Sequence, residues 1–185
     1  ETDARGAIRV GVDMQTTKPG IFSAGDVTDR DQFVYMAAYG AKIAARNAVL
    51  GGAERYDNAA MPWVVFTDPQ VAGVGLTERH ARAAGHDVKT SVLTLDNVPR
   101  ALAARDTRGL IKLVADAKTD HLLGGVIMAP DGADCVQTLV MALSFGMTTK
   151  ALGETIFPYL TTVEGLKLAA QSFDKDVAKL SCCAG

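Results

Sequence analysis

The stretch Met61–Glu78, MPWVVFTDPQVAGVGLTE, decides the fold of this chain. Two short apolar runs flank the turn at Asp68-Pro69-Gln70, and this pattern predicts two neighbouring strands joined by a short connection. Thr77 then stands where the N-cap of a short helix belongs, with Glu78 in its first turn and Gly85 beyond its end. The stretch therefore predicts a strand, a turn, a second strand and a helix in close succession.

The residues after this stretch continue with strands and then change to helices. The elements expected are strands at Val88–Leu95, Leu110–Ala115 and Leu122–Met128, a hairpin connection at 116–121, and helices at about 133–145, 150–155 and 164–173. The first of these helices ends near Gly146 and carries an apolar stripe, which consists of Val136, Leu139, Val140 and Leu143. A run of strands followed by a run of helices predicts an α+β fold, in which helices cover an antiparallel sheet.

Ahead of the stretch, an Ala-rich helix is expected at 35–50, stopped by Gly51-Gly52. Gly6–Val12 is strand-like, and a second apolar strand is expected to end at Ser23-Ala24. The chain does not open with Met and enters the first strand almost at once. We therefore expect that the N-terminal portion of a longer protein is missing.

A glycine and an aspartate, Gly25 and Asp26, follow the second expected strand. In an open α/β sheet, ligands bind in the crevice at the carboxyl ends of the strands, where a polar tip can reach a sugar hydroxyl. The helix after Gln32 can direct its first amide groups at an electron-rich ring. The alternative is an ordinary strand exit with a turn-forming Gly-Asp pair, which these residues on their own favour.

Composition excludes several classes of protein. With 185 residues, of which 48% are hydrophobic, the chain can bury a sizeable core in one domain or in one domain plus a piece of another. The net charge is −2, and the charged residues are scattered without a basic block, which argues against a nucleic-acid partner. No apolar run is long enough to span a bilayer and the first residues lack a signal peptide, so a cytoplasmic location is expected. Three cysteines argue against a disulfide framework, and Cys135 is expected to be a buried small hydrophobe.

Two adjacent thiols, Cys182 and Cys183, stand in the terminal stretch Ser181–Gly185. Neighbouring cysteines close a strained ring if they oxidise to each other. Thiolates are soft ligands that select soft metals, and a flexible chain end can carry two sulfurs onto an ion and hand it to a fixed site. The alternative is a disordered tail with incidental cysteines, and the residues on their own leave the two interpretations about even.

Gly20–Asp26, GIFSAGD, resembles the second flavin-contacting motif of the pyridine nucleotide-disulfide oxidoreductase family. Met61–Glu78 resembles the opening of that family's C-terminal dimerisation domain, and the resemblance continues through Gly109–Val114 and Leu123–Val126 to about Gln171. It implies a C-terminal piece of an α/β FAD-binding domain at 1–57, a dimerisation (interface) domain at 58–175 and a flexible metal-binding tail at 176–185. The α+β fold expected for the interface domain is thus that of a disulfide-reductase dimerisation domain.

The resemblance also implies cofactor contacts. Asp26 would hydrogen-bond the ribityl chain of FAD, Gly25 would let the backbone pass close to the cofactor, and Val34 would present its backbone amide to the flavin ring. NADPH would be bound by parts of the parent protein outside this sequence, which contains no G-x-G-x-x-G fingerprint and no C-x-x-x-x-C redox pair. The chain alone is therefore expected to be inactive.

The sequence departs from the family at Tyr159–Glu164, YLTTVE, where thiol-disulfide members carry His-Pro-Thr-x-x-Glu. Tyr159 replaces the histidine that acts as acid-base catalyst, and a phenol with a pKa of about 10 is a poor proton shuttle at neutral pH. It can donate a hydrogen bond or lie over a metal-thiolate centre. Reduction of an organic disulfide is therefore not expected. Alternatively, Tyr159 fills the dimer interface and Glu164 favours the first turn of the last helix. None of the three histidines falls at this place; they are His80, His86 and His121.

A tyrosine here, together with Cys182 and Cys183 at the end, resembles the family members that reduce mercury. In those homodimers NADPH reduces FAD, and two electrons convert Hg(II) to Hg(0). The tail pair of one subunit delivers Hg(II) to a redox-active cysteine pair of the partner subunit, in exchange with other thiols. The resemblance thus makes Tyr159 and Glu164 catalytic and the two terminal cysteines metal ligands. Two alternatives stay open: part of another FAD-dependent oxidoreductase of the family, or a non-enzymatic dimerisation module whose thiols sequester metal.

Overall fold

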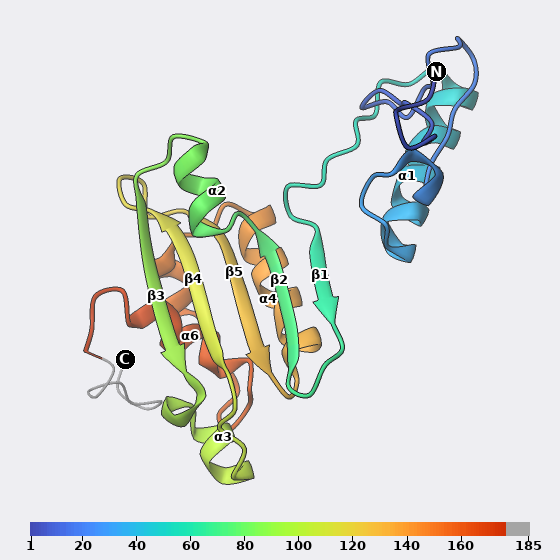
Figure 1. Ribbon diagram of the computed structural model, residues 1–185. Coiled ribbons are helices and arrows are strands. Elements are labelled where there is room, and N and C mark those ends of the chain that lie inside the picture. Colours follow the sequence, from blue (N-terminus) through green and yellow to red (C-terminus); the bar gives the residue numbers. More distant parts are fainter. Residues whose placement is uncertain (177–185) are drawn as a thin grey trace. The chain divides into compact units, whose positions relative to one another are not determined.

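The computed structural model of the chain describes residues 1–176 and divides into two compact units, Glu1–Asn58 and a second unit that begins at Ala59 (Figure 1). Each unit has its own core. None of the helices within the described residues combines the length and the apolar character that crossing a bilayer requires.

The second unit is built on a five-stranded sheet. Its strands are β1 (Pro62–Val65), β2 (Gln70–Gly75), β3 (Val88–Thr94), β4 (Leu110–Asp116) and β5 (Leu122–Ala129). They lie in the order β1-β2-β5-β4-β3, and every neighbouring pair is antiparallel. The strands predicted from the short apolar runs and the hairpin connection predicted at 116–121 are confirmed.

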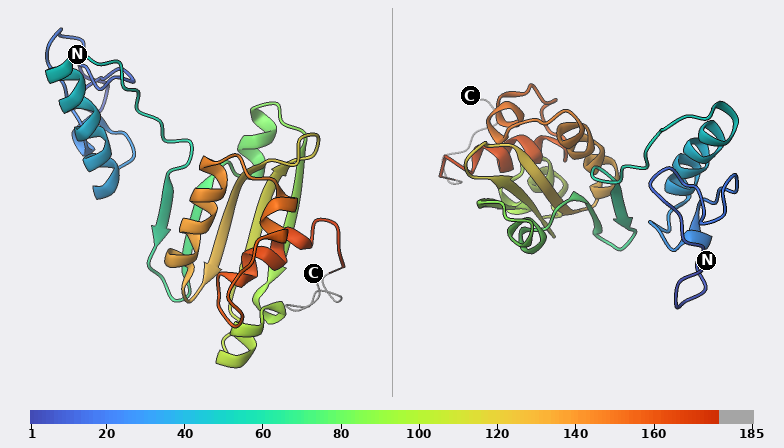
Figure 2. Two further views of the ribbon diagram at one scale, coloured as in Figure 1. Left: turned by 180° about the vertical axis from the view of Figure 1, so that it is seen from behind. Right: turned by 90° about the horizontal axis from the view of Figure 1, so that it is seen from above.

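Three helices cover one face of this sheet, as the front and back views show (Figures 1 and 2). Helix α4 (Gly132–Ser144) packs on β2 and β5, and α6 (Glu164–Gln171) packs on β3 and β4. Helix α5 (Thr149–Glu154) packs against α6. The predicted α+β class, with helices covering an antiparallel sheet, is therefore confirmed.

Two shorter helices join the strands. Helix α2 (Glu78–Ala83) begins after Thr77, whose hydroxyl accepts the His80 N–H at 3.2 Å, as the capping pattern predicted. The 3-10 helix η2 (Leu95–Asn97) and helix α3 (Pro99–Ala104) were not predicted. Proline at the first helical position is a start signal for α3, but six residues are too few for an apolar period to show.

The core of the second unit is a row of side chains that crosses four strands. Leu93 lies opposite Ile111, Ile111 opposite Ile127 and Ile127 opposite Ala72, and all four are 0% exposed. The α4 stripe covers this row, with Leu139 at 0% exposure. Burial of each large apolar side chain contributes about 1.5–3 kcal/mol, so this row and its cover stabilise the unit.

Cys135 lies on α4 within this core and is 4% exposed, which confirms the expected buried hydrophobe. Burial, followed by the nearby charges of Asp131 and Asp134, raises the pKa of its thiol to about 12. The side chain therefore stays protonated and acts as an apolar group rather than as a thiolate.

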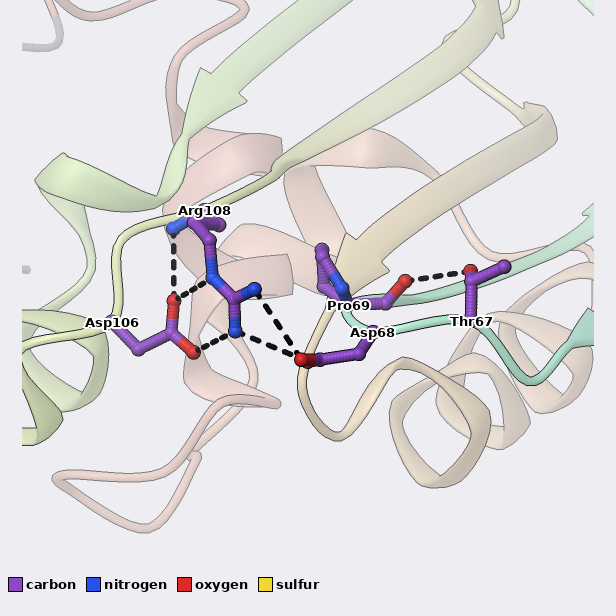
Figure 3. A network of polar contacts seen from close by, with 5 residues as sticks. All are labelled: Thr67, Asp68, Pro69, Asp106 and Arg108. Atoms are coloured by element: carbon purple, nitrogen blue, oxygen red, sulfur yellow. Dashed lines mark hydrogen bonds and ion pairs between the residues drawn. The ribbon is translucent and has the colours of Figure 1, made fainter.

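The turn between β1 and β2 is fastened to the entry of β4 by Arg108 (Figure 3). Its Nη2 donates to Asp106 Oδ2 at 2.8 Å and to Asp68 Oδ1 at 3.1 Å. Thr67 Oγ1 donates to the Pro69 carbonyl at 2.7 Å within the same turn. Hydrogen bonds from Arg108 lower the pKa of Asp106 to about 2, so this bridge is charged at neutral pH.

The first unit is organised around one long helix, α1 (Val34–Leu50), preceded by the 3-10 helix η1 (Asp26–Thr28). Helix α1 ends at Gly51, whose φ of 61° is the left-handed conformation of a glycine stop, and this confirms the expected end. Met14 and Ile43 are 1% and 3% exposed and form a small core.

The prediction of two strands in the first unit is wrong. Gly6–Val12 and the segment that ends at Ser23-Ala24 contribute only isolated bridges, which are Thr2–Ile8, Val10–Thr16 and Gln15–Phe22. Left-handed residues at Gly6, Met14 and Gly20 turn the chain between these bridges, so no extended run is long enough to build a ladder. The strand-like composition of these two segments therefore overestimated the strand content of the first unit.

Candidate functional site

The loop that enters η1 is held against α1 at Gly25. Its φ of 82° and ψ of −164° lie in a region that residues other than glycine avoid. A Cβ added at Gly25 would also lie 3.3 Å from the Cβ of Ala37, near the start of α1. Both backbone conformation and packing therefore require glycine at this position.

Asp26 begins η1, and its side chain is exposed. At the start of α1, the N-cap Phe33 provides no side-chain hydrogen bond, and Val34 is 85% exposed. The first amides of a helix have no partner within the helix and carry partial positive charge. The contact of Gly25 with Ala37 places all three predicted cofactor residues, Gly25, Asp26 and Val34, at the same end of α1.

This arrangement fits a flavin nucleotide in chemical terms. An exposed carboxylate can accept hydrogen bonds from the hydroxyls of a sugar alcohol, and the positive end of a helix attracts an electron-rich ring. Val27 and Val34, which are 51% and 85% exposed, offer apolar surface that a ring can cover. The contacts of Gly25, Asp26 and Val34 with FAD stay a prediction.

Asp31, which was not predicted as a site residue, holds the segment between η1 and α1. The Tyr56 hydroxyl donates to Asp31 Oδ2 at 3.0 Å, and Asn58 Nδ2 donates to the same oxygen at 2.7 Å. Burial and the hydrogen bond from its hydroxyl to Asp31 raise the pKa of Tyr56 above its usual range. The guanidinium of Arg30 lies 5.7 Å from the Tyr56 ring centre and donates to the Val10 carbonyl at 3.0 Å. The only local signal was an acidic residue shortly before a helix.

A second candidate region is the loop between α5 and α6, which contains Tyr159. The Tyr159 side chain is 63% exposed. Its hydroxyl makes no hydrogen bond with any residue of the described part of the chain, 1–176. An exposed phenol without a partner is free to donate to a group supplied by another molecule.

Glu164 lies at the start of α6 and is 2% exposed. Its Oε2 accepts the backbone N–H of Leu160 at 3.2 Å, and its own N–H donates to Thr161 Oγ1 at 3.3 Å. Within residues 1–176 no hydrogen bond joins it to Tyr159. The geometry therefore shows Glu164 holding the loop, while the predicted catalytic roles of Tyr159 and Glu164 stay predictions.

Two threonines fasten the same loop. Thr161 Oγ1 donates to the Pro158 carbonyl at 2.8 Å, which closes the loop on itself. Thr162 Oγ1 donates to Asp131 Oδ2 at 2.8 Å, directly before α4. The backbone on both sides of Tyr159 is thus fixed although the ring itself is exposed.

The predicted metal ligands Cys182 and Cys183 lie outside the described residues. Within residues 1–176 no three His, Cys, Asp or Glu side chains gather closely enough to hold a metal ion. His86 Nδ1 lies 3.0 Å from Asp116 Oδ2, and this contact, followed by the N–H groups of Thr119 and Lys118, lowers the pKa of Asp116 to about 2. His86 is thus engaged in a pair away from the Tyr159 loop.

A hollow of about 580 Å³ on the second unit was also missed by the sequence analysis. Trp63 and residues of α2, β2, β4 and β5 line it. Lys112 Nζ donates to Glu78 Oε2 at 2.7 Å and Arg82 Nη2 to Glu78 Oε1 at 3.1 Å. These hydrogen bonds, Lys112 first, lower the pKa of Glu78. The side chains of Glu78, Arg82 and Lys112 are therefore hydrogen-bonded to one another.

The sequence profile of the pyridine nucleotide-disulphide oxidoreductase dimerisation domain matches residues 61–170. The chain belongs to this family. The match covers the whole five-stranded sheet and nearly all of α6, so the family predicted from the two motifs is confirmed.

Relatives within the pyridine nucleotide-disulphide oxidoreductase family are similar over the entire chain. A mercuric reductase of Bacillus cereus is 52% identical over 185 residues, which is 100% of this chain and 29% of that protein. A mercuric reductase of Acidithiobacillus ferrooxidans is 51% identical over 99% of this chain and 33% of its own length. The chain thus spans about a third of these relatives and is similar to their C-terminal part, as predicted.

Solved structures of two other proteins superpose on this chain and share its fold. The HOCl-induced flavoprotein disulfide reductase RclA of Escherichia coli superposes with a TM-score of 0.84 at 31% identity, over 92% of this chain and 40% of that one. LpdA of Mycobacterium tuberculosis superposes with a TM-score of 0.84 at 24% identity, over 92% of this chain and 37% of that one. The second likeness concerns the fold alone.

Proposed function

We propose that this chain is the C-terminal part of an NADPH-dependent flavoprotein that reduces Hg(II) to Hg(0). The observation that carries the proposal is identity of about half, over the whole chain, to proteins named mercuric reductase. Residues 1–57 then complete an FAD-binding domain, residues 58–175 form the interface of a homodimer, and residues 176–185 form the metal-binding tail. The parent protein works in the cytoplasm and contributes to mercury resistance.

FAD, when bound, supplies a two-electron carrier between NADPH and the metal. In this chain Asp26 would accept hydrogen bonds from the ribityl hydroxyls, and the backbone amide of Val34 at the start of α1 would help to bind the flavin ring. Gly25 keeps this loop close to α1, which fixes the distance between the carboxylate and the helix start. NADPH is bound by the part of the parent protein that lies outside this chain.

The route of the metal begins at the terminal thiols. Cys182 and Cys183 take Hg(II) from small thiols by ligand exchange, in which one thiolate enters as another leaves. The pair then passes the metal to the active site of the partner subunit, where two electrons convert Hg(II) to Hg(0). Soft thiolates suit this task because they bind Hg(II) strongly yet exchange by direct attack.

Tyr159 acts on the metal-thiolate centre of the active site shared between subunits. Its exposed hydroxyl, without a hydrogen bond among the described residues, is available to donate to a thiolate. Glu164 supports this role by accepting the Leu160 N–H and so fixing the loop. A phenol cannot replace histidine as a proton shuttle at neutral pH, which favours metal over organic disulfide as the substrate.

A titration of this chain with Hg(II) against competing small thiols tests the proposal. We expect tight one-to-one binding that is lost in the Cys182→Ala/Cys183→Ala double variant and kept in Cys135→Ala. Cys135 is the matched control because its thiol is buried in α4. Binding that is weak, or that survives the loss of both tail thiols, would show that the tail does not receive the metal.

A second candidate function has one specific support, the likeness to the flavoprotein disulfide reductase RclA at 31% identity. In that case the parent reduces a different acceptor and the tail thiols are incidental. Turnover of an organic disulfide by the full parent protein, with no turnover of Hg(II), would favour this candidate.

A further inference from the structure

Leu160, the neighbour of Tyr159, has an unusual backbone conformation. Its φ is 63°, in the left-handed region that aliphatic side chains rarely adopt. Such a conformation persists only where surrounding contacts hold it. Here the buried carboxylate of Glu164 accepts the Leu160 N–H at 3.2 Å, and this bond supplies the support.

The left-handed turn lies directly after Tyr159 in a loop that is anchored at several points. The loop is anchored on both sides, by Thr161 to the Pro158 carbonyl and by Thr162 to Asp131. The Tyr159 ring is 63% exposed, and its hydroxyl has no hydrogen bond in the described part of the chain to orient it. Within the described residues, the backbone at residues 159 and 160 therefore carries the ring without help from a hydrogen bond of the phenol.

We infer that Leu160 is the positioning residue for Tyr159, because its left-handed backbone and its N–H bond to Glu164 together present the phenol outward. A proline could provide neither feature, since its ring fixes φ near about −65° and it has no N–H. The thiol-disulfide motif has proline at this position. In this chain the backbone at Leu160 thus orients Tyr159 in a way that a proline at the same position could not.

The use of the phenol rests on the proposed function, whereas the conformation of the loop does not. A tyrosine at position 159 followed by proline would lie on a differently directed backbone. The carboxylate oxygen of Glu164 that now accepts the Leu160 N–H would then need another donor. The inference therefore predicts that the effect of residue 160 follows its backbone preference and not its size or polarity.

NMR on this chain with ring-labelled tyrosine tests the inference, with Tyr159→Phe assigning the signals. We expect Leu160→Pro and Leu160→Val to shift the Tyr159 ring signals, since proline and β-branched residues disfavour a positive φ. Leu160→Gly and Leu160→Asn should keep them at the wild-type positions, because both residues tolerate that conformation. Leu160 is 39% exposed, so loss of its side chain alone disturbs little.

Two further readouts complete the test. Hydrogen exchange of the Leu160 amide should become about tenfold faster in Glu164→Ala, in line with the loss of one hydrogen bond. Backbone signals of β4 and β5 report whether each variant is folded, and Leu160→Val carries the test if Leu160→Pro does not fold. Unchanged Tyr159 signals in folded Leu160→Val, or shifts in Leu160→Gly as large as in Leu160→Val, would overturn the inference. None of these readouts needs mercury or flavin, so the outcome is independent of the Hg(II) titration.

Discussion

The two units of this chain hold their candidate residues in different ways. In the second unit a five-stranded sheet and three covering helices form a continuous core, and a buried carboxylate, Glu164, fastens the Tyr159 loop to it. In the first unit a single long helix and irregular segments enclose a small core around Met14 and Ile43. Its candidate residues lie at an uncapped helix start with exposed Val34.

This difference teaches what each unit depends on. The second unit buries enough apolar surface to be stable through its own packing. The first unit leaves the apolar side chain of Val34 exposed at a helix start that no side chain of the N-cap residue caps, so a ligand that binds there adds stability by mass action. Substitutions in the core should therefore lower the free energy of unfolding of the second unit. The free energy of unfolding of the first unit should depend both on its core and on a bound ligand.

The largest expected effect comes from the core of the second unit. Leu113→Ala, at a side chain that is 0% exposed, should lower the free energy of unfolding by about 3 kcal/mol because it leaves a cavity among packed neighbours. Urea unfolding followed by Trp63 fluorescence measures this, since Trp63 is the single tryptophan and lies in β1. The control is Leu102→Ala, at a side chain that is 55% exposed. A loss as small as that of the control would show that the sheet is not the source of stability.

A smaller effect is expected from the core of the first unit. Met14→Ala should cost about 2–3 kcal/mol, but only in the transition that tyrosine reports, because three of the four tyrosines lie in this unit. The Trp63 transition should stay where it is. Val49→Ala, at an 81% exposed position of α1, is the matched control. Equal shifts of both signals would mean that the two units unfold together.

The smallest effect concerns pH. Asp120 is partly buried, which opposes ionisation, but Lys89, the Thr149 hydroxyl and the Lys150 N–H lower the pKa of its carboxyl to about 2. An unfolded aspartate has a pKa of about 3.9, so the contribution of Asp120 is present above pH 4 and is lost as pH falls towards 2. Relative to Asp120→Asn, the wild-type chain should lose about 1 kcal/mol between these two pH values.

Urea midpoints from Trp63 fluorescence at both pH values measure this loss. The exposed turn residue Asp87, changed to Asn, provides the control. An identical pH dependence of wild type and Asp120→Asn would mean that the contacts of Asp120 add no stability. Asp120 would then not count among the charged residues that stabilise the second unit.

The sequence predicted best where local rules and packing agree. Short apolar runs bounded by turn residues predicted the strands of the second unit, Thr77 predicted the start of α2, and Gly51 predicted the end of α1, because each depends on neighbouring residues alone. The same rules failed at Gly6–Val12, where left-handed turns interrupt the extended chain. The tertiary structure, and not the local sequence pattern, sets the backbone conformation of this segment.

The candidate sites show the same limit. Family resemblance predicted Gly25, Asp26 and Val34, and the structure places them at one helix end. Nothing local predicted the bonds of Asp31 to Tyr56 and Asn58, since these partners lie 25 and 27 residues away. The left-handed conformation of Leu160 was equally out of reach, because its support from Glu164 exists only in the folded loop.

A chimaera tests the proposed function most directly. This chain would replace the equivalent C-terminal segment of the Bacillus cereus mercuric reductase, to which it is 52% identical. NADPH oxidation and Hg(0) release would be measured with Hg(II) supplied in excess small thiol. The account predicts that the chimaera reduces Hg(II) and that the Cys182→Ala/Cys183→Ala version loses most of its turnover at limiting Hg(II). A flavin-loaded chimaera that reduces an organic disulfide but not Hg(II), or one indifferent to loss of both tail thiols, would contradict it.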